Sequence, residues 1–388
     1  MRRAIAIAAV AGMFTVTAHA DAPGETGAAV MGAARAMILQ ARAAVCPGPN
    51  RGPIPSAIAL AERLGYAQAE GPDRRGWITL TDPTRGRMLL AERRRGTRLD
   101  GYELQADVPI AGLPRPVMMA RFGPDCAQVL ARAIDHDATG RAQSIRDLDD
   151  TLHATGSLQV LDPPVPVAND PGGVRVGHID SGVNYLLPVI GLRLARRADG
   201  GALGWDYWDD DPRPFDLNPA GSPFFPLHHG TAVASVLLAE APRASLIAYR
   251  YPRPDMTRMA ALVEAAANAG AVVVMVPMGS AKRDDWQAFE DAARRHPNVL
   301  FVVSAGNDGR DIDLQPVYPA ALNLDNMVVV TSADDFGRLA PGSNWGAESV
   351  DLMVPGEAVA VIDHRGATGK ASGSSFAVPR LAALAARM

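Results

Sequence analysis

Lysine is almost absent from this sequence, and aromatic residues are few. Only Lys282 and Lys370 occur among 388 residues, and phenylalanine, tryptophan and tyrosine together make up 5%. We interpret this bias, with its excess of arginine and small residues, as genome base composition rather than chemistry. The formal net charge of −4 is too close to balance to favour a nucleic-acid or membrane-surface partner. The length is sufficient for one large domain and a smaller one.

The sequence also lacks a long apolar run after its first twenty residues, so we expect no transmembrane segment. Those twenty residues are typical of a signal peptide. Arg2 and Arg3 are followed by the apolar stretch 4–16, which is too short to span a bilayer, and by the small-residue cleavage site 18–20. We expect a mature chain that begins near Asp21 and is exported, to the periplasm or the medium. The alternative is a buried N-terminal helix.

Cysteine is scarce too. Cys46 and Cys126 are the two cysteines of the chain. In an oxidising compartment a single pair favours one disulfide, which would connect two points of the N-terminal region. The alternative is two buried free thiols.

Residues 21–140 have the pattern of a small α+β domain. Helical patterns at 28–45 and 55–64 precede short alternating runs, which are separated by glycine, proline and aspartate as in a hairpin-rich sheet. These runs cover residues 76–80, 87–91, 102–108 and 116–122. The many arginines of this region are expected to form a solvated face, or alternatively to complement the acidic stretch 209–211. Because proline removes donors and fixes φ, we expect a proline-rich linker over 141–172.

From residue 173 to 388 apolar runs of strand length alternate with helical patterns. Strands are expected at 174–179, 244–249, 271–276, 299–303 and 327–331, and helices at 230–239, 256–269, 286–295 and 375–387. This alternation predicts an α/β domain of three layers, with a parallel sheet between helices. Active sites of such sheets lie at the carboxyl ends of the strands.

Two polar motifs stand where that rule expects them. Asp180 ends an apolar strand in Gly-His-Ile-Asp-Ser-Gly, although a capping aspartate would look the same. His229 precedes Gly-Thr and an apolar helix, and histidine has a pKa suited to general-base catalysis near neutral pH. The small Gly230 would let that helix approach the site. His228 is the competing candidate, and a helix cap with a surface histidine is the structural alternative.

Two further motifs follow. Asn307, after a buried strand and Gly306, has an amide that can donate to an oxyanion, although an asparagine turn is the commoner explanation. Ser375 stands at the start of an apolar helix, where its N–H lacks an intrahelical partner and the helix end favours negative charge. A serine-rich helix cap is the alternative. The order Asp, His, Ser is that of the subtilisin triad.

These motifs resemble those of the subtilisin-like serine peptidases, or subtilases, over about residues 173–388. The similar stretches are Ile179-Asp180-Ser-Gly, His229-Gly-Thr-x-Val-Ala, Ser304-Ala-Gly-Asn307, Ser343-Asn-Trp-Gly346 and Gly373-Ser-Ser375-x-Ala-x-Pro379. The resemblance implies a subtilisin-like fold and a catalytic triad of Asp180, His229 and Ser375 with Asn307 in the oxyanion hole. It implies no cofactor for the chemistry and a polypeptide substrate.

Other parts depart from the family. The stretch that would pair with the substrate backbone is Pro277-Met278-Gly279, and with Gly306 it is our candidate for substrate binding, through the carbonyls of Pro277 and Gly279. The chain ends thirteen residues after Ser375, where relatives generally continue. Many relatives bind calcium, but the acidic stretch 206–211 has no diagnostic ligand spacing, and a solvated loop is the simpler expectation.

The N-terminal domain occupies the place of the family's pro-domain. It would then act as an intramolecular chaperone and inhibitor and be removed by cleavage in the linker, and a retained accessory domain is the alternative. We expect a serine endopeptidase made as a zymogen. The competing hypothesis is a catalytically inactive subtilase-like binding module, and an esterase is disfavoured because no Gly-x-Ser-x-Gly motif surrounds Ser375.

Overall fold

The computed structural model describes residues 25–46 and 54–388, so the signal peptide expected at 1–20 lies outside the described residues. The chain divides into two compact units. Among the described residues, one unit consists of 25–46, 54–141 and 146–157, and the other of 142–145 and 158–388. Each unit has its own hydrophobic core.

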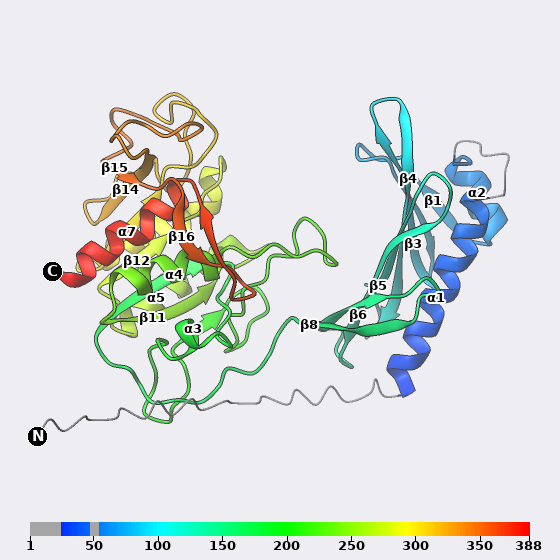
Figure 1. Ribbon diagram of the computed structural model, residues 1–388, viewed down its shortest axis with the longest axis horizontal. Helices are drawn as coiled ribbons and strands as arrows, with labels where there is room; N and C mark the ends of the chain where they lie inside the picture. The colour runs from blue at the N-terminus through cyan, green and yellow to red at the C-terminus, as the bar shows by residue number, and fades with distance from the viewer. Residues whose placement is uncertain (1–24, 47–53) are drawn as a thin grey trace, which may run out of the picture. The chain divides into compact units, whose positions relative to one another are not determined.

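The first unit is a meandering antiparallel sheet with two helices, α1 (Glu25–Val45) and α2 (Ala57–Leu64) (Figure 1). Its strands follow the sheet in chain order: β1 (Gln68–Glu70), β2 (Trp77–Asp82), β3 (Gly86–Arg95), β4 (Arg98–Ile110), β5 (Leu113–Phe122), β6 (Gln128–His136), β7 (Ala142–Leu148) and β8 (Ala154–Val160). Short turns between alternating apolar runs place strands that are consecutive in the sequence next to one another in the sheet. The α+β prediction for this region is therefore confirmed.

Helix α1 packs one face against the sheet. Ala34, Ile38 and Ala41 are buried on it, together with Leu104 and Met118 from the strands. By length and composition, residues 27–45 of this helix are apolar enough to cross a membrane, which the sequence analysis did not expect. A single helix of this kind near the N-terminus is weak evidence for a membrane span. Packing of α1 on the sheet accounts for its apolar face.

A disulfide joins Cys46, directly after α1, to Cys126 in the turn between β5 and β6, with 6.0 Å between the Cα atoms. The predicted pair is thus present. It closes a loop with a sequence separation of 80 residues within the first unit. Such a cross-link stabilises a fold mainly by restricting the unfolded chain.

Replacing both cysteines by serine is expected to lower the free energy of unfolding of the first unit by about 2–5 kcal/mol. Differential scanning calorimetry of the full chain would measure this. The transition of the second unit is the internal control, because that unit contains neither cysteine. Unchanged melting of the first unit would contradict the prediction.

The linker is shorter than predicted. Residues 142–148 and 154–160 form β7 and β8, so the prediction of a linker is wrong over most of 141–160. Cross-strand ion pairs explain why this polar sequence forms a strand: Arg146 pairs with Asp135 at 2.5 Å, and Asp147 pairs with Arg132 at 3.0 Å. The proline-rich part, 161–172, has no regular secondary structure.

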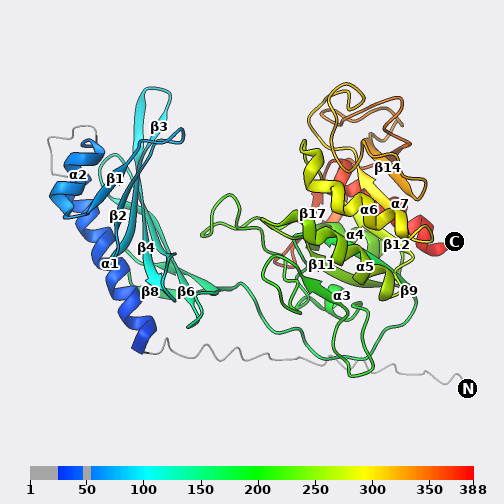
Figure 2. The same ribbon diagram turned by 180° about the vertical axis from the view of Figure 1, so that it is seen from behind.

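The second unit is built on a parallel sheet of seven strands, in the order β10-β11-β9-β12-β13-β14-β15 (Figures 1 and 2). Its strands are β9 (Val174–Asp180), β10 (Gly204–Asp206), β11 (Ala244–Arg250), β12 (Val273–Val276), β13 (Leu300–Ser304), β14 (Met327–Ala333) and β15 (Leu352–Pro355). The helices are α3 (Pro188–Gly191), α4 (Gly230–Glu240), η1 (Met256–Arg258), α5 (Met259–Asn268), η2 (Arg283–Trp286), α6 (Gln287–Arg295) and α7 (Ser374–Arg387). The predicted three-layer α/β architecture is confirmed.

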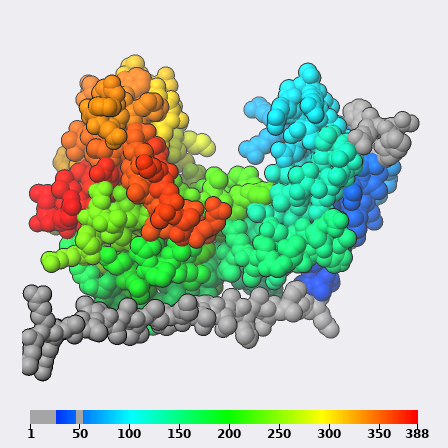
Figure 3. All heavy atoms as spheres, viewed as in Figure 1, coloured from blue at the N-terminus to red at the C-terminus, as the bar shows by residue number. Residues whose placement is uncertain are grey.

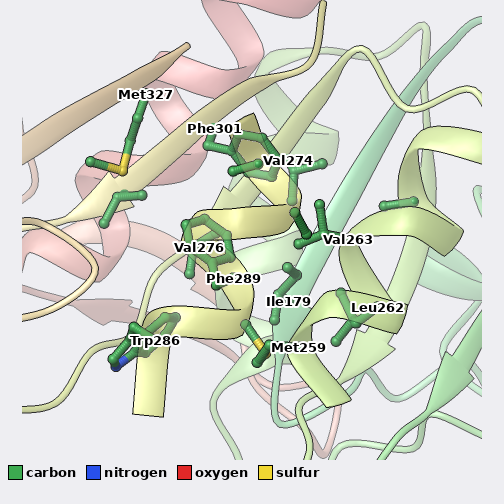
Figure 4. Close-up of a cluster of buried hydrophobic side chains, with 14 of the residues drawn as sticks. Ile179, Met259, Leu262, Val263, Val274, Val276, Trp286, Phe289, Phe301 and Met327 are labelled. Atoms are coloured by element: carbon green, nitrogen blue, oxygen red, sulfur yellow. The ribbon is translucent and has the colours of Figure 1, made fainter. Parts of the chain in front are cut away.

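Two apolar layers enclose this sheet. On one face Ile179, Val274 and Phe301 pack against Leu262 of α5 and Phe289 of α6 (Figure 4). The other face is covered by α4 and α7, whose buried residues meet side chains of β9, β12 and β14. The two helices that carry the His and Ser motifs therefore lie on the same face of the sheet.

A small hairpin completes the unit. Strands β16 (Val359–Ile362) and β17 (Thr368–Ala371) pair antiparallel, contact α4, and directly precede α7. They form the orange-red surface beside α7 (Figure 3). The sequence analysis did not predict this hairpin.

Candidate active site

Asp180 and His229 meet at the carboxyl edge of the sheet. Asp180 is the last residue of β9, and His229 is the N-cap of α4. The Nδ1 atom of His229 lies 2.9 Å and 2.8 Å from the two carboxylate oxygens of Asp180. Gly230 permits this approach, because a Cβ there would lie 2.1 Å from the carbonyl oxygen of Gly182.

The electrostatics of this pair favour charge separation. Burial alone would raise the pKa of Asp180, but the charge on His229 and hydrogen bonds from His178 and His229 hold that pKa well below its usual range. Burial would lower the pKa of His229, but the charge and hydrogen bond of Asp180 outweigh it and raise the pKa above 6.5. The side chain of His229 is still 39% exposed, so a substrate can reach it.

Asp216, which the sequence analysis did not single out, fixes the backbone at His229. One of its oxygens accepts the N–H of His229 at 3.1 Å and the hydroxyl of Ser181 at 2.6 Å. The other accepts the N–H and the hydroxyl of Thr231. This fully buried carboxylate therefore holds the start of α4 in place.

Ser375 is the second residue of α7, in line with the prediction of a serine at the helix start. Gly373 before it has φ 128°, which glycine adopts without strain. The Ser375 Oγ donates to the carbonyl oxygen of Pro277 at 3.1 Å. Among the described residues, no hydrogen bond joins Ser375 to His229.

Asn307 is held by the residue next to Ser375. Its Oδ1 accepts the N–H of Ser374 at 2.8 Å and the Ser374 hydroxyl at 2.9 Å. Asn344 fixes the same segment from behind, since its Nδ2 donates to the carbonyl of Ala305. Gly306 is required here, because a Cβ would lie 2.5 Å from Asn344 Nδ2.

A cavity of about 330 Å³ lies beside Ser375. Its lining includes Ser375, Asn307 and the four residues predicted to bind substrate, Pro277, Met278, Gly279 and Gly306. Apart from Ser375, which belongs to α7, these residues come from the segments that follow β12 and β13. The sheet edge thus brings the Asn and Ser motifs to one opening.

A profile of the Subtilase family matches residues 172–388, more than half of the chain. The chain belongs to the subtilase family.

Individual relatives of this subtilase are distant. Halolysin of Haloferax mediterranei is 27% identical over 197 residues, which cover 47% of this chain and 35% of halolysin. Subtilisin-like protease 2 of Plasmodium falciparum is 26% identical over 87 residues, or 22% of this chain and 6% of that protein. The subtilase chain therefore spans about a third or less of the length of these curated relatives.

Two of the solved structures with detectable similarity are proteases. A lanthipeptide protease has 23% identity and a TM-score of 0.46, with 56% of this chain and 73% of that chain covered. A cold-adapted subtilisin-like serine proteinase has 24% identity and a TM-score of 0.45, with 59% and 80% covered.

One cluster of the subtilase has potential metal ligands: Asp216, His228 and His364 lie with ligand atoms within 4.8 Å of one another. The two imidazoles are stacked, with ring centroids 3.7 Å apart. Each Asp216 oxygen already accepts two protein donors. This arrangement fits a structural role behind His229 better than metal coordination. His228 contacts the carbonyl oxygen of Asp216 there.

The acidic stretch of the subtilase is paired with arginines of its own unit. Asp206 and Asp209 contact Arg250, Asp210 contacts Arg258, and Asp211 contacts Arg213. These pairs give no support to calcium binding at this stretch. The acidic residues thus have arginine partners within the second unit. They do not require the arginines of the first unit, which the sequence analysis gave as alternative partners.

His178 is a further polar residue at the site that the sequence analysis missed. Its Nε2 lies 3.2 Å from Asp180 Oδ2. Strand alternation was the available signal, since residues two apart on β9 face the same side.

Proposed function

We propose that this subtilase is a serine endopeptidase that cleaves peptide bonds through an acyl-enzyme on Ser375. The observation that carries the proposal is the contact of both Asp180 oxygens with His229 Nδ1, while Ser375 lies in the first turn of α7. A carboxylate on Nδ1 fixes the tautomer whose Nε2 is a free base. The family assignment supports the same chemistry.

The steps follow from this arrangement. Ser375 Oγ leaves the Pro277 carbonyl by rotation about its side-chain bond and gives its proton to Nε2 of His229 as it attacks the substrate carbonyl. Catalytic hydrogen bonds of unliganded enzymes often form only with substrate, so the bond to Pro277 is compatible with this role. His229 then protonates the leaving amine, and water hydrolyses the acyl-enzyme by the same route.

Asn307 and the Ser375 N–H are the proposed oxyanion donors. The Oδ1 of Asn307 is occupied by Ser374, which leaves Nδ2 as the end of the amide for a substrate oxygen. The N–H of Ser375 lies in the first turn of α7, where helix N–H groups have no intrahelical partner. Both donors are fixed before substrate arrives, which is the condition for strong stabilisation of the transition state.

Replacing Asn307 by leucine is expected to lower kcat about 10²–10³-fold with little change in KM, because the donor acts on the transition state. Steady-state kinetics on a peptide substrate would measure both constants. Leu314→Asn is the matched control, because Leu314 is exposed and lies outside the cavity lining. This variant should have the same kcat and KM as the unmodified protein. A rise in KM alone would instead assign Asn307 to ground-state binding.

Substrate would bind as an extended chain along the segment after β12. The carbonyls of Pro277 and Gly279 are its candidate acceptors, and a strand that adds to such an edge is held mainly by main-chain hydrogen bonds. Gly279 lies close to a neighbouring segment, since a Cβ there would be 2.7 Å from the carbonyl oxygen of Tyr318. Met278 and Gly306 would contact the substrate residue that enters the cavity.

The cavity lining predicts the preference for that residue. Val317 is an apolar wall, and Arg310 is paired with Asp308 at 2.5 Å. We expect the unmodified protein to prefer a small apolar residue at this position of the substrate. In Asp308→Ala the guanidinium of Arg310 is freed and should favour an acidic residue by about fivefold. That ratio corresponds to ~1 kcal/mol, the size expected for a partly exposed ion pair. Peptide-library cleavage would measure the preference. The double variant with Arg310→Ala should lose it, and an acidic preference that persists there would contradict this assignment.

We also infer that the first unit is an intramolecular chaperone and inhibitor of the second. Supporting this, it is compact, has its own core, and precedes the subtilase domain. The chain after β8 is attached to the second unit: Tyr185 donates to the carbonyl of Pro163, Arg213 pairs with Asp162, and Arg196 donates to the carbonyl of Pro166. Cleavage between the units would therefore leave residues 161–172 on the second unit, which N-terminal sequencing of the processed protein would test.

Export is part of the proposal. The signal-peptide pattern in residues 1–20 and the disulfide both fit an oxidising compartment outside the cytoplasm. Fractionation of cells that express the full chain would locate the protein.

The decisive experiment is labelling of the purified protein with a fluorophosphonate probe, with mass mapping of the modified peptide and Ser375→Ala as control. We expect one label, on Ser375. If the parent is not labelled even after the first unit has been removed by limited proteolysis, the peptidase proposal fails and a catalytically inactive binding module takes its place. If Ser375 is labelled, comparing turnover of peptide and ester substrates would separate a peptidase from an esterase.

A further inference from the structure

Asp180 contacts a second imidazole besides that of His229. His178 lies two residues earlier on β9, on the same face of the strand, and its Nε2 is 3.2 Å from Asp180 Oδ2. The carboxylate thus lies between two histidines. His229 approaches it from the start of α4, and His178 approaches it from within the sheet.

His178 is in an apolar layer. Its neighbours across the sheet are Ala248 on β11 and Met275 on β12, both buried, and His178 itself is 1% exposed. Burying a polar ring costs free energy unless it is hydrogen-bonded. Within residues 25–46 and 54–388, its Nδ1 has no hydrogen-bond partner, so the single side-chain hydrogen bond of this ring goes to Asp180.

We propose that His178 is a positioning residue for the triad, whose Nε2–H holds the Asp180 carboxylate so that both oxygens face His229 Nδ1. With the proton on Nε2, only a lone pair on Nδ1 is left without a partner. Asp180 Oδ1 is held in parallel by the N–H of Ser181 at 2.6 Å. One oxygen is therefore fixed by the backbone and the other by His178.

The proposal has a pH signature, and it rests on the proposed function for its kinetic part. A donor on Oδ2 disperses the negative charge that stabilises the His229 cation. Its loss should raise the pKa of His229 and move the acidic limb of kcat/KM to higher pH. The other titratable or charged groups around the pair are Asp216, His364, Tyr251 and Arg250, and substitution at 178 leaves all four unchanged.

The kinetic test compares His178→Val with His178→Gln. The valine variant, which has no donor, should lose about tenfold in kcat and show the shifted limb, whereas glutamine, whose amide can donate, should retain most of the parent's rate. Ser245→Ala is the matched control, because Ser245 is a buried residue of β11 whose hydroxyl has no partner in the described chain. A valine variant with the parent's kcat and pH profile would overturn the proposal.

A second measurement needs neither activity nor a folded variant. In the full-length parent with ¹⁵N-labelled histidine, the ring shifts of His178 should place its proton on Nε2. A proton on Nδ1 would overturn the proposal whatever the kinetics show. Failure of the parent to react with a fluorophosphonate would refute the peptidase function separately, while this NMR result would still decide the role of His178.

Discussion

Replacing His229 by alanine is expected to lower kcat about 10⁶-fold, with KM nearly unchanged. Among the histidines that the structure describes, His229 alone combines a contact with both oxygens of Asp180 and a partly exposed side chain. Without it, the Ser375 hydroxyl has no base and the leaving amine has no acid. Steady-state kinetics on a peptide substrate, with fluorophosphonate labelling rates as a second readout, would measure the loss.

His228 is the matched control for this experiment. It is adjacent in sequence, but its Nδ1 contacts the carbonyl oxygen of Asp216 at 2.6 Å and its ring stacks on His364. His228→Ala should therefore change kcat less than about tenfold. If His228→Ala abolished turnover and His229→Ala did not, the assignment of the general base would be wrong.

Replacing Asp180 by asparagine is expected to lower kcat about 10⁴-fold near neutral pH. The amide cannot hold His229 in the tautomer that leaves Nε2 free, and it removes the charge that raises the pKa of His229. The acidic limb of the pH profile should move to lower pH, because the neutral imidazole then persists further into acid. A pH series of kcat/KM would measure both effects.

Asp206→Asn separates this effect from the general loss of a buried carboxylate. Asp206 is as buried as Asp180 but pairs with Arg250 at 2.8 Å, and burial raises its pKa to about 6. This variant should lose stability and keep its kcat. Equal losses of kcat in the two variants would contradict a specific role of Asp180.

The parts of the fold that could be predicted from the sequence are the strands of the parallel sheet that are buried on both faces. Strand β13 is an apolar run up to Ser304, and β9 is buried from Val176 to Asp180, so the carboxyl ends of both strands are recognisable from the sequence. Asp180 and Asn307 follow from those ends, and His229 and Ser375 follow from the helices that begin beside Gly230 and Gly373.

What the sequence did not reveal depends on pairing between distant segments. Strand β7 is stabilised by ion pairs with β6, and a polar stretch of this kind has no apolar alternation to mark it. Asp216 lies in an irregular loop, so nothing local indicates that it holds the backbone of His229. Strand alternation could have revealed His178, but it could not show that the ring has no hydrogen-bond partner other than Asp180 in the described part of the chain.

The segment 161–172 decides where a shortened recombinant version of the catalytic unit should begin. Arg196 is 3% exposed, and its guanidinium donates to the carbonyls of Pro166 and Gly191. A version that began at residue 173, the boundary suggested by the strand pattern, would leave this buried cation short of an acceptor and the Tyr185 hydroxyl without Pro163. Beginning at Leu161 keeps both, so those twelve residues belong to the minimal folding unit of the enzyme although they contain no helix or strand.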